Sequence, residues 1–199
     1  IDWGHNLEAF PANIRDDTKV IFIANPNNPT GTYNSHQEVH CLLKNIPSSI
    51  LVVLDCAYFE YVKKSDYVDP LALLNEFDNL LVTKSFSKIQ GLASARIGYG
   101  IGQPELIEVL NRIRQPFNVN SFAQELACEA INDKEHIKKS IDLNLAEGAF
   151  LFAELTQLGL ECIPSVGNFI SFKGNFNGQE MFTSLMEKGV IIRPIDLYG

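Results

Sequence analysis

Short, fully apolar runs recur along the first hundred residues, each followed by a polar turn. Val20–Ala24 (VIFIA) and Ile50–Leu54 (ILVVL) are two such runs, and a third begins at Leu80–Val82. Continuous apolar runs of this length are typical of strands buried on both faces of a parallel sheet. A fourth stretch, Ile97–Ile101, comes only about fourteen residues after Val82. That gap is too short for a helical crossover, so we predict that this strand runs antiparallel.

Helical patterns fill the longer gaps between the strands. Ser35–Ile46 has helical spacing, with Ser35 placed as an N-cap and Glu38 three residues later. Asp69–Phe77 carries a proline near its first turn. Helical crossovers of this kind join parallel strands by right-handed connections. The chain is therefore predicted to have an α/β fold, a mostly parallel sheet covered by helices.

The second half of the chain is first helical and then mixed. Pro104–Leu158 has a helical pattern with a predicted break at Arg114–Asn120. The tail then reads as strand, helix and strand over Cys162–Phe172, Gln179–Lys188 and Val190–Ile195. We predict a large domain over residues 1–145 and the start of a smaller α/β domain over residues 146–199.

Composition narrows the class of protein. The chain has 199 residues, is 46% hydrophobic and carries a net charge of −8, which favours one sizeable core and disfavours nucleic acid or an anionic membrane as a partner. No apolar run approaches the length of a transmembrane helix and no signal peptide is visible.

The first residue is not a methionine, so we expect a piece of a longer chain. We also expect four phenylalanines of the helical half to lie in the core: Phe117, Phe122, Phe150 and Phe152.

The cysteines point to a cellular compartment. Four of them are spread along the chain without paired spacing, at positions Cys41, Cys56, Cys128 and Cys162. This distribution favours reduced core thiols over disulfides, and so a cytoplasmic protein.

Polar and ionisable residues follow the predicted strands where each one ends. The turn Asn25–Gly31 (NPNNPTG) follows the first strand, Asp55 and Tyr58 follow the second, and Ser85, Ser87 and Lys88 follow the third. Ligands of open parallel sheets bind at the carboxyl ends of the strands. These residues are therefore predicted to line one crevice.

The chemistry of this set points to one cofactor. Asp55 ends an apolar run, so we expect it to be partly desolvated and to need a cation, such as a protonated ring nitrogen. Lys88 can form a Schiff base with an aldehyde. Ser85, Ser87 and Arg96 are suited to binding a phosphate. An aldehyde, a ring nitrogen and a phosphate on one molecule describe pyridoxal phosphate (PLP).

The order of the motifs resembles a known family. NPNNPTG, then LDCAYFEY (residues 54–61), then SFSKIQGLASARIGYG (residues 85–100) are similar to segments of the fold-type I PLP-dependent aminotransferases, and most similar to the histidinol-phosphate aminotransferases. The later GNFISF (residues 167–172) and GVIIRPIDLYG (residues 189–199) resemble segments of the small domain in the same family. The resemblance is dense over residues 20–100 and thinner beyond.

The resemblance implies a role for each matching residue. Lys88 would hold the cofactor covalently and later shuttle a proton, and Asp55 would pair with the pyridine nitrogen. Tyr58 and Asn28 would hydrogen-bond the 3′-oxygen of the ring. Further residues would bind the cofactor phosphate or lie near the substrate: Ser85, Ser87 and Arg96 at the phosphate, and Arg193 and Asn168 at the substrate.

Cys56 departs from the family, in which a glutamate usually follows the aspartate, and we expect little consequence.

The resemblance also implies a reaction and an assembly. The expected reaction converts histidinol phosphate and 2-oxoglutarate to imidazole acetol phosphate and glutamate, a step of histidine biosynthesis. Aromatic amino-acid aminotransferases and threonine-phosphate decarboxylases look alike over this region and stay open as alternatives. Family members are homodimers with sites built across the interface. The family's upstream phosphate loop and stacked aromatic ring, and its downstream second arginine, are not among these residues.

Three other interpretations fit less well. Ser85–Lys88 is formally an S-x-x-K motif of serine–lysine acyl-transfer enzymes, but their further S-D-N and K-T-G elements are missing from the sequence. A non-catalytic scaffold would not be expected to retain Lys88, Asp55, Tyr58 and Arg96 together. His36 and His40 have metal-ligand spacing, but Gln37 stands where a zinc protease has its glutamate, so we expect no metal site.

Overall fold

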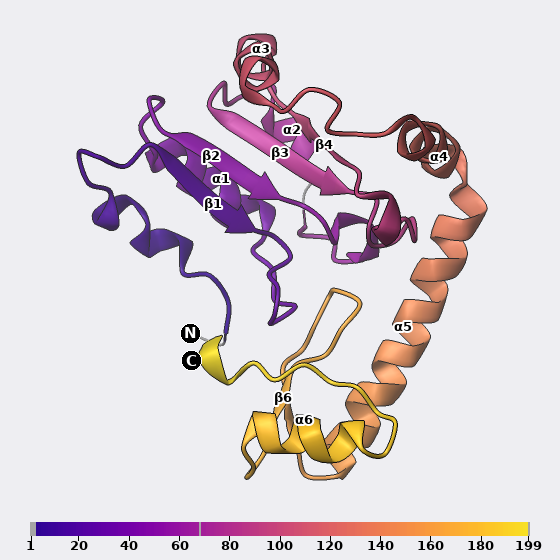
Figure 1. Cartoon of the computed structure of the whole chain (residues 1–199). Helices are drawn as coiled ribbons and strands as arrows, with labels where there is room; N and C mark the ends of the chain where they lie inside the picture. Colours follow the sequence, from indigo (N-terminus) through magenta and orange to yellow (C-terminus); the bar gives the residue numbers. More distant parts are fainter. Residues whose placement is uncertain (1–2, 68, 199) are drawn as a thin grey trace.

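The computed structural model describes residues 3–67 and 69–198, and its larger part is built on a four-stranded sheet (Figure 1). The strands are β1 (Val20–Ala24), β2 (Leu51–Asp55), β3 (Leu80–Ser85) and β4 (Gly98–Ile101), in that spatial order. β1, β2 and β3 are parallel, and β4 is antiparallel to β3. The mostly parallel sheet and its antiparallel fourth strand were both predicted, and both are confirmed.

Helices α1 (His36–Asn45) and α2 (Pro70–Leu73) cover one face of this sheet (Figure 1). Val39, Leu42 and Leu43 of α1 are buried in one cluster with the strand residues Ile23 and Val52. The Ser35 side chain caps α1 as predicted, in a reciprocal capping box with Glu38. α2 is shorter than the predicted helix over 69–77, because the chain after Leu73 continues as turns. The short 3₁₀ turns η1 (Leu7–Ala9) and η2 (Pro11–Asn13) precede β1.

Three helices follow the sheet: α3 (Pro104–Ile113), α4 (Ser121–Asn132) and α5 (Lys134–Gln157). The predicted break between α3 and α4 is confirmed, and a second break lies at Asp133, whose side chain caps α5. The expectation that the phenylalanines of this region are core residues is wrong for three of the four, and Phe152 is only partly buried. Phe117, Phe122 and Phe150 are 97%, 81% and 58% exposed, because the described elements leave one side of these helices uncovered.

The tail contains less regular structure than predicted. Its elements are β5 (Glu161–Cys162), β6 (Phe172–Lys173), α6 (Gly178–Met186) and η5 (Asp196–Tyr198). The helix was predicted. The long strand over 162–172 is wrong, since only its two ends pair, antiparallel to each other. The strand over 190–195 is also wrong: within the described ranges this segment has no partner strand.

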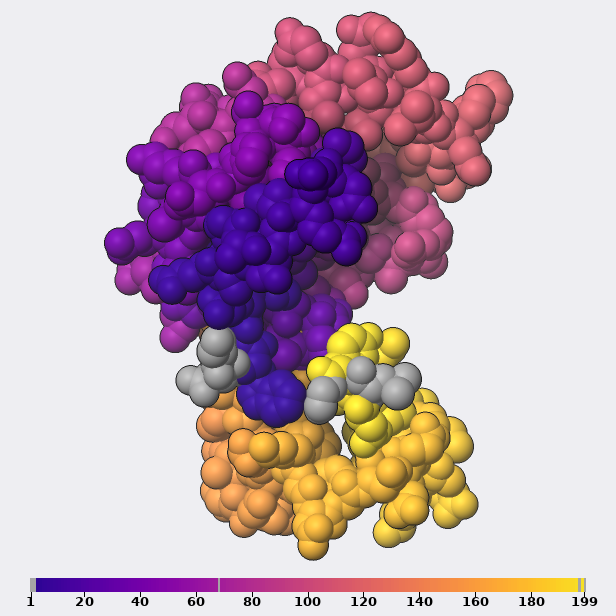
Figure 2. All heavy atoms as spheres, turned by 90° about the vertical axis from the view of Figure 1, so that its left-hand side faces the viewer, coloured from indigo at the N-terminus to yellow at the C-terminus, as the bar shows by residue number. Residues whose placement is uncertain are grey.

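The C-terminal part forms a separate body that contacts the sheet part on one side (Figure 2). α5 is continuous from Lys134 to Gln157 and links the two bodies, so the predicted boundary between residues 145 and 146 falls inside this helix.

No helix in the described ranges is long and apolar enough to cross a membrane. All four cysteines lie in these ranges and are free thiols, but only Cys56 is buried, so the expectation of core thiols holds for that residue alone.

Candidate active site

The turn after β1 carries Asn28 and is held by several internal hydrogen bonds. Asn25 is 2% exposed and bonds the backbone of Asn34 twice, through Nδ2 at 3.0 Å and through Oδ1 at 2.9 Å. Gly31 closes the loop with φ of +74° and donates to the Asn27 carbonyl at 2.8 Å. A Cβ at Gly31 would meet Ser165 at 2.0 Å, so glycine permits both the turn and the approach of the C-terminal segment.

The turn after β2 carries Asp55 and Tyr58. The Asp55 carboxylate accepts from the Ala57 amide at 3.0 Å and is exposed. The expectation that Asp55 is partly desolvated is therefore wrong for the described residues, because the carboxyl end of β2 opens into the crevice. Tyr58 is only 6% exposed, and its hydroxyl accepts a 2.8 Å hydrogen bond from Asn28 Nδ2. The structure thus brings together the two residues predicted to bind the 3′-oxygen of the ring.

Lys88 lies in the loop between β3 and β4, with its neighbours anchored in the core. Phe86 and Ile89 are 5% and 2% exposed, and the Lys88 carbonyl accepts from Gly91 at 2.9 Å. Lys88 Nζ lies 5.1 Å from the centroid of the Tyr58 ring. Asn28, Tyr58 and Lys88 come from three segments far apart in sequence and converge on one point of the crevice.

The side chains of Ser85, Ser87 and Arg96 lie together at the loop that carries Lys88. Ser85 Oγ accepts from the Ser87 amide at 3.0 Å. Arg96 follows the 3₁₀ turn η4 (Ala93–Ala95) with φ of 52°. Its guanidinium donates to the Ala93 carbonyl at 2.8 Å and to Ser87 Oγ at 3.4 Å. The side chain is otherwise exposed, which leaves donors free for an anion.

Of the two predicted substrate residues, the structure places one on a cavity with Asn28. Arg193 lines a cavity of about 860 Å³ between the turn after β1 and the C-terminal body, which Asn28 and Phe169 also line. Asn168 is exposed and does not line this cavity. Its predicted role rests on the motif alone.

Two contacts of this site were missed from the sequence. The Phe169 ring packs edge-on against the Tyr58 ring, with centroids 5.2 Å apart. His136 Nε2 lies 2.9 Å from the carbonyl oxygen of Ile89, directly after Lys88. Phe169 belongs to the GNFISF segment and could have been weighed with its neighbour Asn168, whereas nothing in the sequence around His136 points to the loop.

Burial keeps two side chains behind the site neutral. It raises the pKa of the Cys56 thiol to about 12. It also raises the pKa of Tyr67, whose hydroxyl donates to the Asn25 carbonyl at 2.6 Å. Cys56 therefore acts as a small core residue rather than as a nucleophile.

The sequence profile described as "Aminotransferase class I and II" matches residues 1–199. The chain belongs to this aminotransferase family. Enzymes of the family depend on PLP, and the converging amine, phenol, amide, hydroxyl, guanidinium and carboxylate groups are chemically suited to its aldehyde, ring oxygen, phosphate and ring nitrogen.

Individual relatives give a finer comparison. The chain is 48% identical over 198 residues to a histidinol-phosphate aminotransferase of Pseudomonas fluorescens, covering 100% of this chain and 54% of that protein. It is 44% identical over 197 residues to one of Nitrosococcus oceani, covering 99% of this chain and 53% of that protein. The chain thus spans about half the length of these relatives.

A solved structure agrees in fold. The histidinol-phosphate aminotransferase of Sinorhizobium meliloti, in complex with pyridoxal-5′-phosphate, superposes with a TM-score of 0.89 at 28% identity. The match covers 97% of this chain and 54% of that one.

Proposed function

We propose that the protein containing this chain is a PLP-dependent aminotransferase that converts histidinol phosphate and 2-oxoglutarate to imidazole acetol phosphate and glutamate, in the cytoplasm, as a step of histidine biosynthesis. The observation that carries the proposal is the convergence of Lys88, Tyr58 and Asn28 at the carboxyl edge of the sheet. The high identity to histidinol-phosphate aminotransferases supports the choice of substrate.

Six residues would hold the cofactor in addition to Lys88. Lys88 would bind it covalently through its amine. Tyr58 and Asn28 would contact the ring oxygen, where the existing bond between their side chains already orients both groups. Asp55 would face the ring nitrogen with the carboxylate oxygens left exposed at the crevice. The remaining three residues would bind the phosphate: Ser85, Ser87 and Arg96.

When bound, PLP supplies an electron sink that stabilises the charge left after removal of the α-proton. This chain's own residues would do the rest. Lys88 would take the proton from the substrate α-carbon and deliver it to the cofactor C4′ atom, since its amine lies at the proposed ring site, 5.1 Å from the centroid of the Tyr58 ring. The Asp55 carboxylate would keep the ring nitrogen protonated.

The substrate would enter from the cavity side. Arg193 would face an anionic end of the donor or of the 2-oxo acid acceptor, because it lines the cavity that reaches Asn28. Asn168 is proposed as a weaker substrate contact. Residues 1–145 are proposed as part of the PLP-binding large domain and residues 146–199 as the start of the small domain.

Partners of the enzyme are proposed to be these small molecules and a second copy of the protein. The large exposed side chains of α4 and α5 support a homodimer. Neither nucleic acid nor a membrane is proposed as a partner, given the net charge of −8.

The substrate is tested by offering amino donors to the full-length protein loaded with PLP. Histidinol phosphate is expected to convert the absorption band of the loaded protein to that of pyridoxamine phosphate, and 2-oxoglutarate to restore it. Discharge only by an aromatic amino acid would support the first alternative. Release of carbon dioxide from threonine phosphate would support the second, and either result would overturn the substrate proposed.

A further inference from the structure

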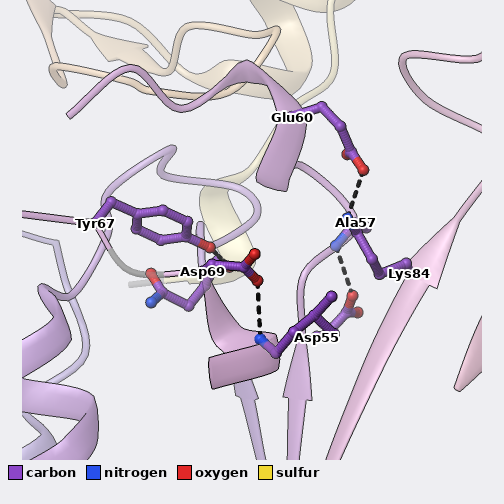
Figure 3. Close-up of polar contacts among 8 residues, drawn as sticks. Asp55, Ala57, Glu60, Tyr67, Asp69 and Lys84 are labelled. Carbon is purple, nitrogen blue, oxygen red and sulfur yellow. Dashed lines mark hydrogen bonds and ion pairs between the residues drawn. The ribbon is translucent and has the colours of Figure 1, made fainter. Parts of the chain in front are cut away.

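One ion pair behind the site is buried. Lys84 Nζ of β3 lies 2.7 Å from Glu60 Oε1 of η3 (Phe59–Tyr61), and the side chains are only 11% and 17% exposed. The Lys84 ammonium also sits 4.0 Å from the centroid of the Phe59 ring. Figure 3 shows the pair beside the turn that runs from Asp55 through Ala57. Among the described residues, every other ion pair has at least one partner more than half exposed.

Stability alone does not explain a pair in this position. Removing two charges from water offsets much of their attraction, so apolar residues of similar size often serve a core as well or better. An ion pair also specifies position, because two buried charges are both satisfied only when the segments that carry them bring the two groups into contact. The two parts of the chain that this pair joins therefore matter more than its contribution to stability.

The pair joins the two turns that carry the proposed cofactor ligands. Tyr58 is the N-cap of η3, two residues before Glu60. Ser85 directly follows Lys84 at the end of β3. At the start of this turn, the Cys56 amide donates a 2.8 Å hydrogen bond to the Thr83 carbonyl of β3. Beyond that point the Glu60–Lys84 ion pair is the polar contact that joins η3 to β3, beside the apolar packing of Tyr58 and Tyr61 against Ile89.

We propose that Glu60 and Lys84 are positioning residues, whose ion pair sets the placement of Tyr58 relative to Lys88 and so the affinity and ionisation of the bound cofactor. The inference rests on the proposed function, because it assumes that PLP occupies the crevice. It requires no contact between either residue and the cofactor. The expected consequence of breaking the pair is a displaced η3 turn and a weakened Asn28–Tyr58 contact with the ring oxygen.

The test uses Glu60→Gln and Lys84→Met in the full-length protein, with Glu108→Gln as a matched control. Glu108 pairs with Arg112 on α3, but both side chains are more than half exposed. Three quantities are measured for each variant: the Kd for PLP, the pH midpoint at which the visible band of the loaded protein titrates, and Tm without cofactor. Each single variant is expected to bind PLP about tenfold or more weakly, a loss of the size seen when the hydrogen-bond partners of metal ligands are removed, and to show a moved pH midpoint. Lys84→Arg, which keeps the charge, is expected to restore both.

The outcomes separate the alternatives. A lower Tm with an unchanged Kd and pH midpoint would overturn the proposal, because the pair would then only stabilise the fold. If the single variants fail to fold, the double variant Glu60→Leu with Lys84→Met removes both charges and is read by the same Kd and midpoint. Wild-type values in that double variant would also overturn it. No visible band in the wild-type protein would instead refute the proposed function.

Discussion

At the residue scale, the site is made by side chains whose types were predictable and whose surroundings were not. The apolar runs locate the strand ends, so Asn28, Tyr58 and Lys88 could be placed at one edge from the sequence alone. Their contacts could not, since the 2.8 Å bond from Asn28 to Tyr58 depends on the path of two loops. Asp55 was expected to be desolvated and is exposed, because a run of apolar residues predicts burial of the strand and not of the residue that ends it.

Asp55→Asn separates ring-nitrogen pairing from cofactor docking. An amide of the same shape can still occupy the site, but it lacks the negative charge that keeps the ring nitrogen protonated. We expect kcat to fall by about 10²–10³-fold, as when a preorganised electrostatic partner is lost, while the Kd for PLP changes much less. Steady-state kinetics and PLP titration of the full-length variant measure both. Equal losses in kcat and affinity would count against this role.

At the element scale, local signals succeeded where the chain supplies its own partners. Ser35 and Glu38 mark the start of α1, and β4 is antiparallel because the segment before it is too short to cross the sheet. The predicted strand over 190–195 failed for the opposite reason. A strand needs a neighbour for its backbone groups, and Ile191 is 81% exposed with no neighbouring strand in the described ranges. An apolar pattern alone does not reveal whether that neighbour is present.

The capping box of α1 predicts a pH-dependent stability. The hydrogen bond from the Ser35 side chain is the largest cause that lowers the pKa of Glu38. A carboxylate with a lowered folded-state pKa stabilises the protein at pH values above its unfolded-state pKa, and this stabilisation is lost as pH falls through the folded value. Ser35→Ala is expected to lower the free energy of unfolding by about 1 kcal/mol at pH 7. Its difference from wild type should shrink below about pH 4.

Denaturant unfolding of the full-length protein at several pH values measures this difference. Ser48→Ala is the control, since Ser48 is an exposed serine just beyond α1. An effect of Ser35→Ala that stays constant from pH 7 to about pH 3 would contradict the capping account.

At the scale of the whole molecule, the described chain leaves large apolar side chains uncovered. Phe122 and Leu126 of α4 and Leu143 and Phe150 of α5 are all about half exposed or more, from 49% to 81%. α5 buries only Ile141, and Figure 1 shows one side of it open. Exposed apolar area of this kind marks surfaces that meet another chain or another part of the same protein. The sequence could predict these helices but not what covers them.

The proposed homodimer can be tested by placing a charge on the exposed apolar surface of α4. Sedimentation of the full-length protein is expected at the mass of a dimer, and Phe122→Asp is expected to shift the equilibrium towards the monomer, because it places a charge in an apolar contact. Asn132→Asp adds the same charge at a polar position of α4 and is expected to leave the dimer intact. A wild-type protein that sediments as a monomer would refute the proposed assembly.

The most direct test of the whole account is to find where the cofactor is attached. The full-length protein is loaded with PLP, reduced with borohydride to make the attachment permanent, digested, and its peptides are weighed by mass spectrometry. The account predicts the added pyridoxyl mass on Lys88, and no such mass on Lys84 four residues earlier, because Lys84 is held by Glu60. Modification of Lys84 or another lysine in place of Lys88, or of none, would contradict it.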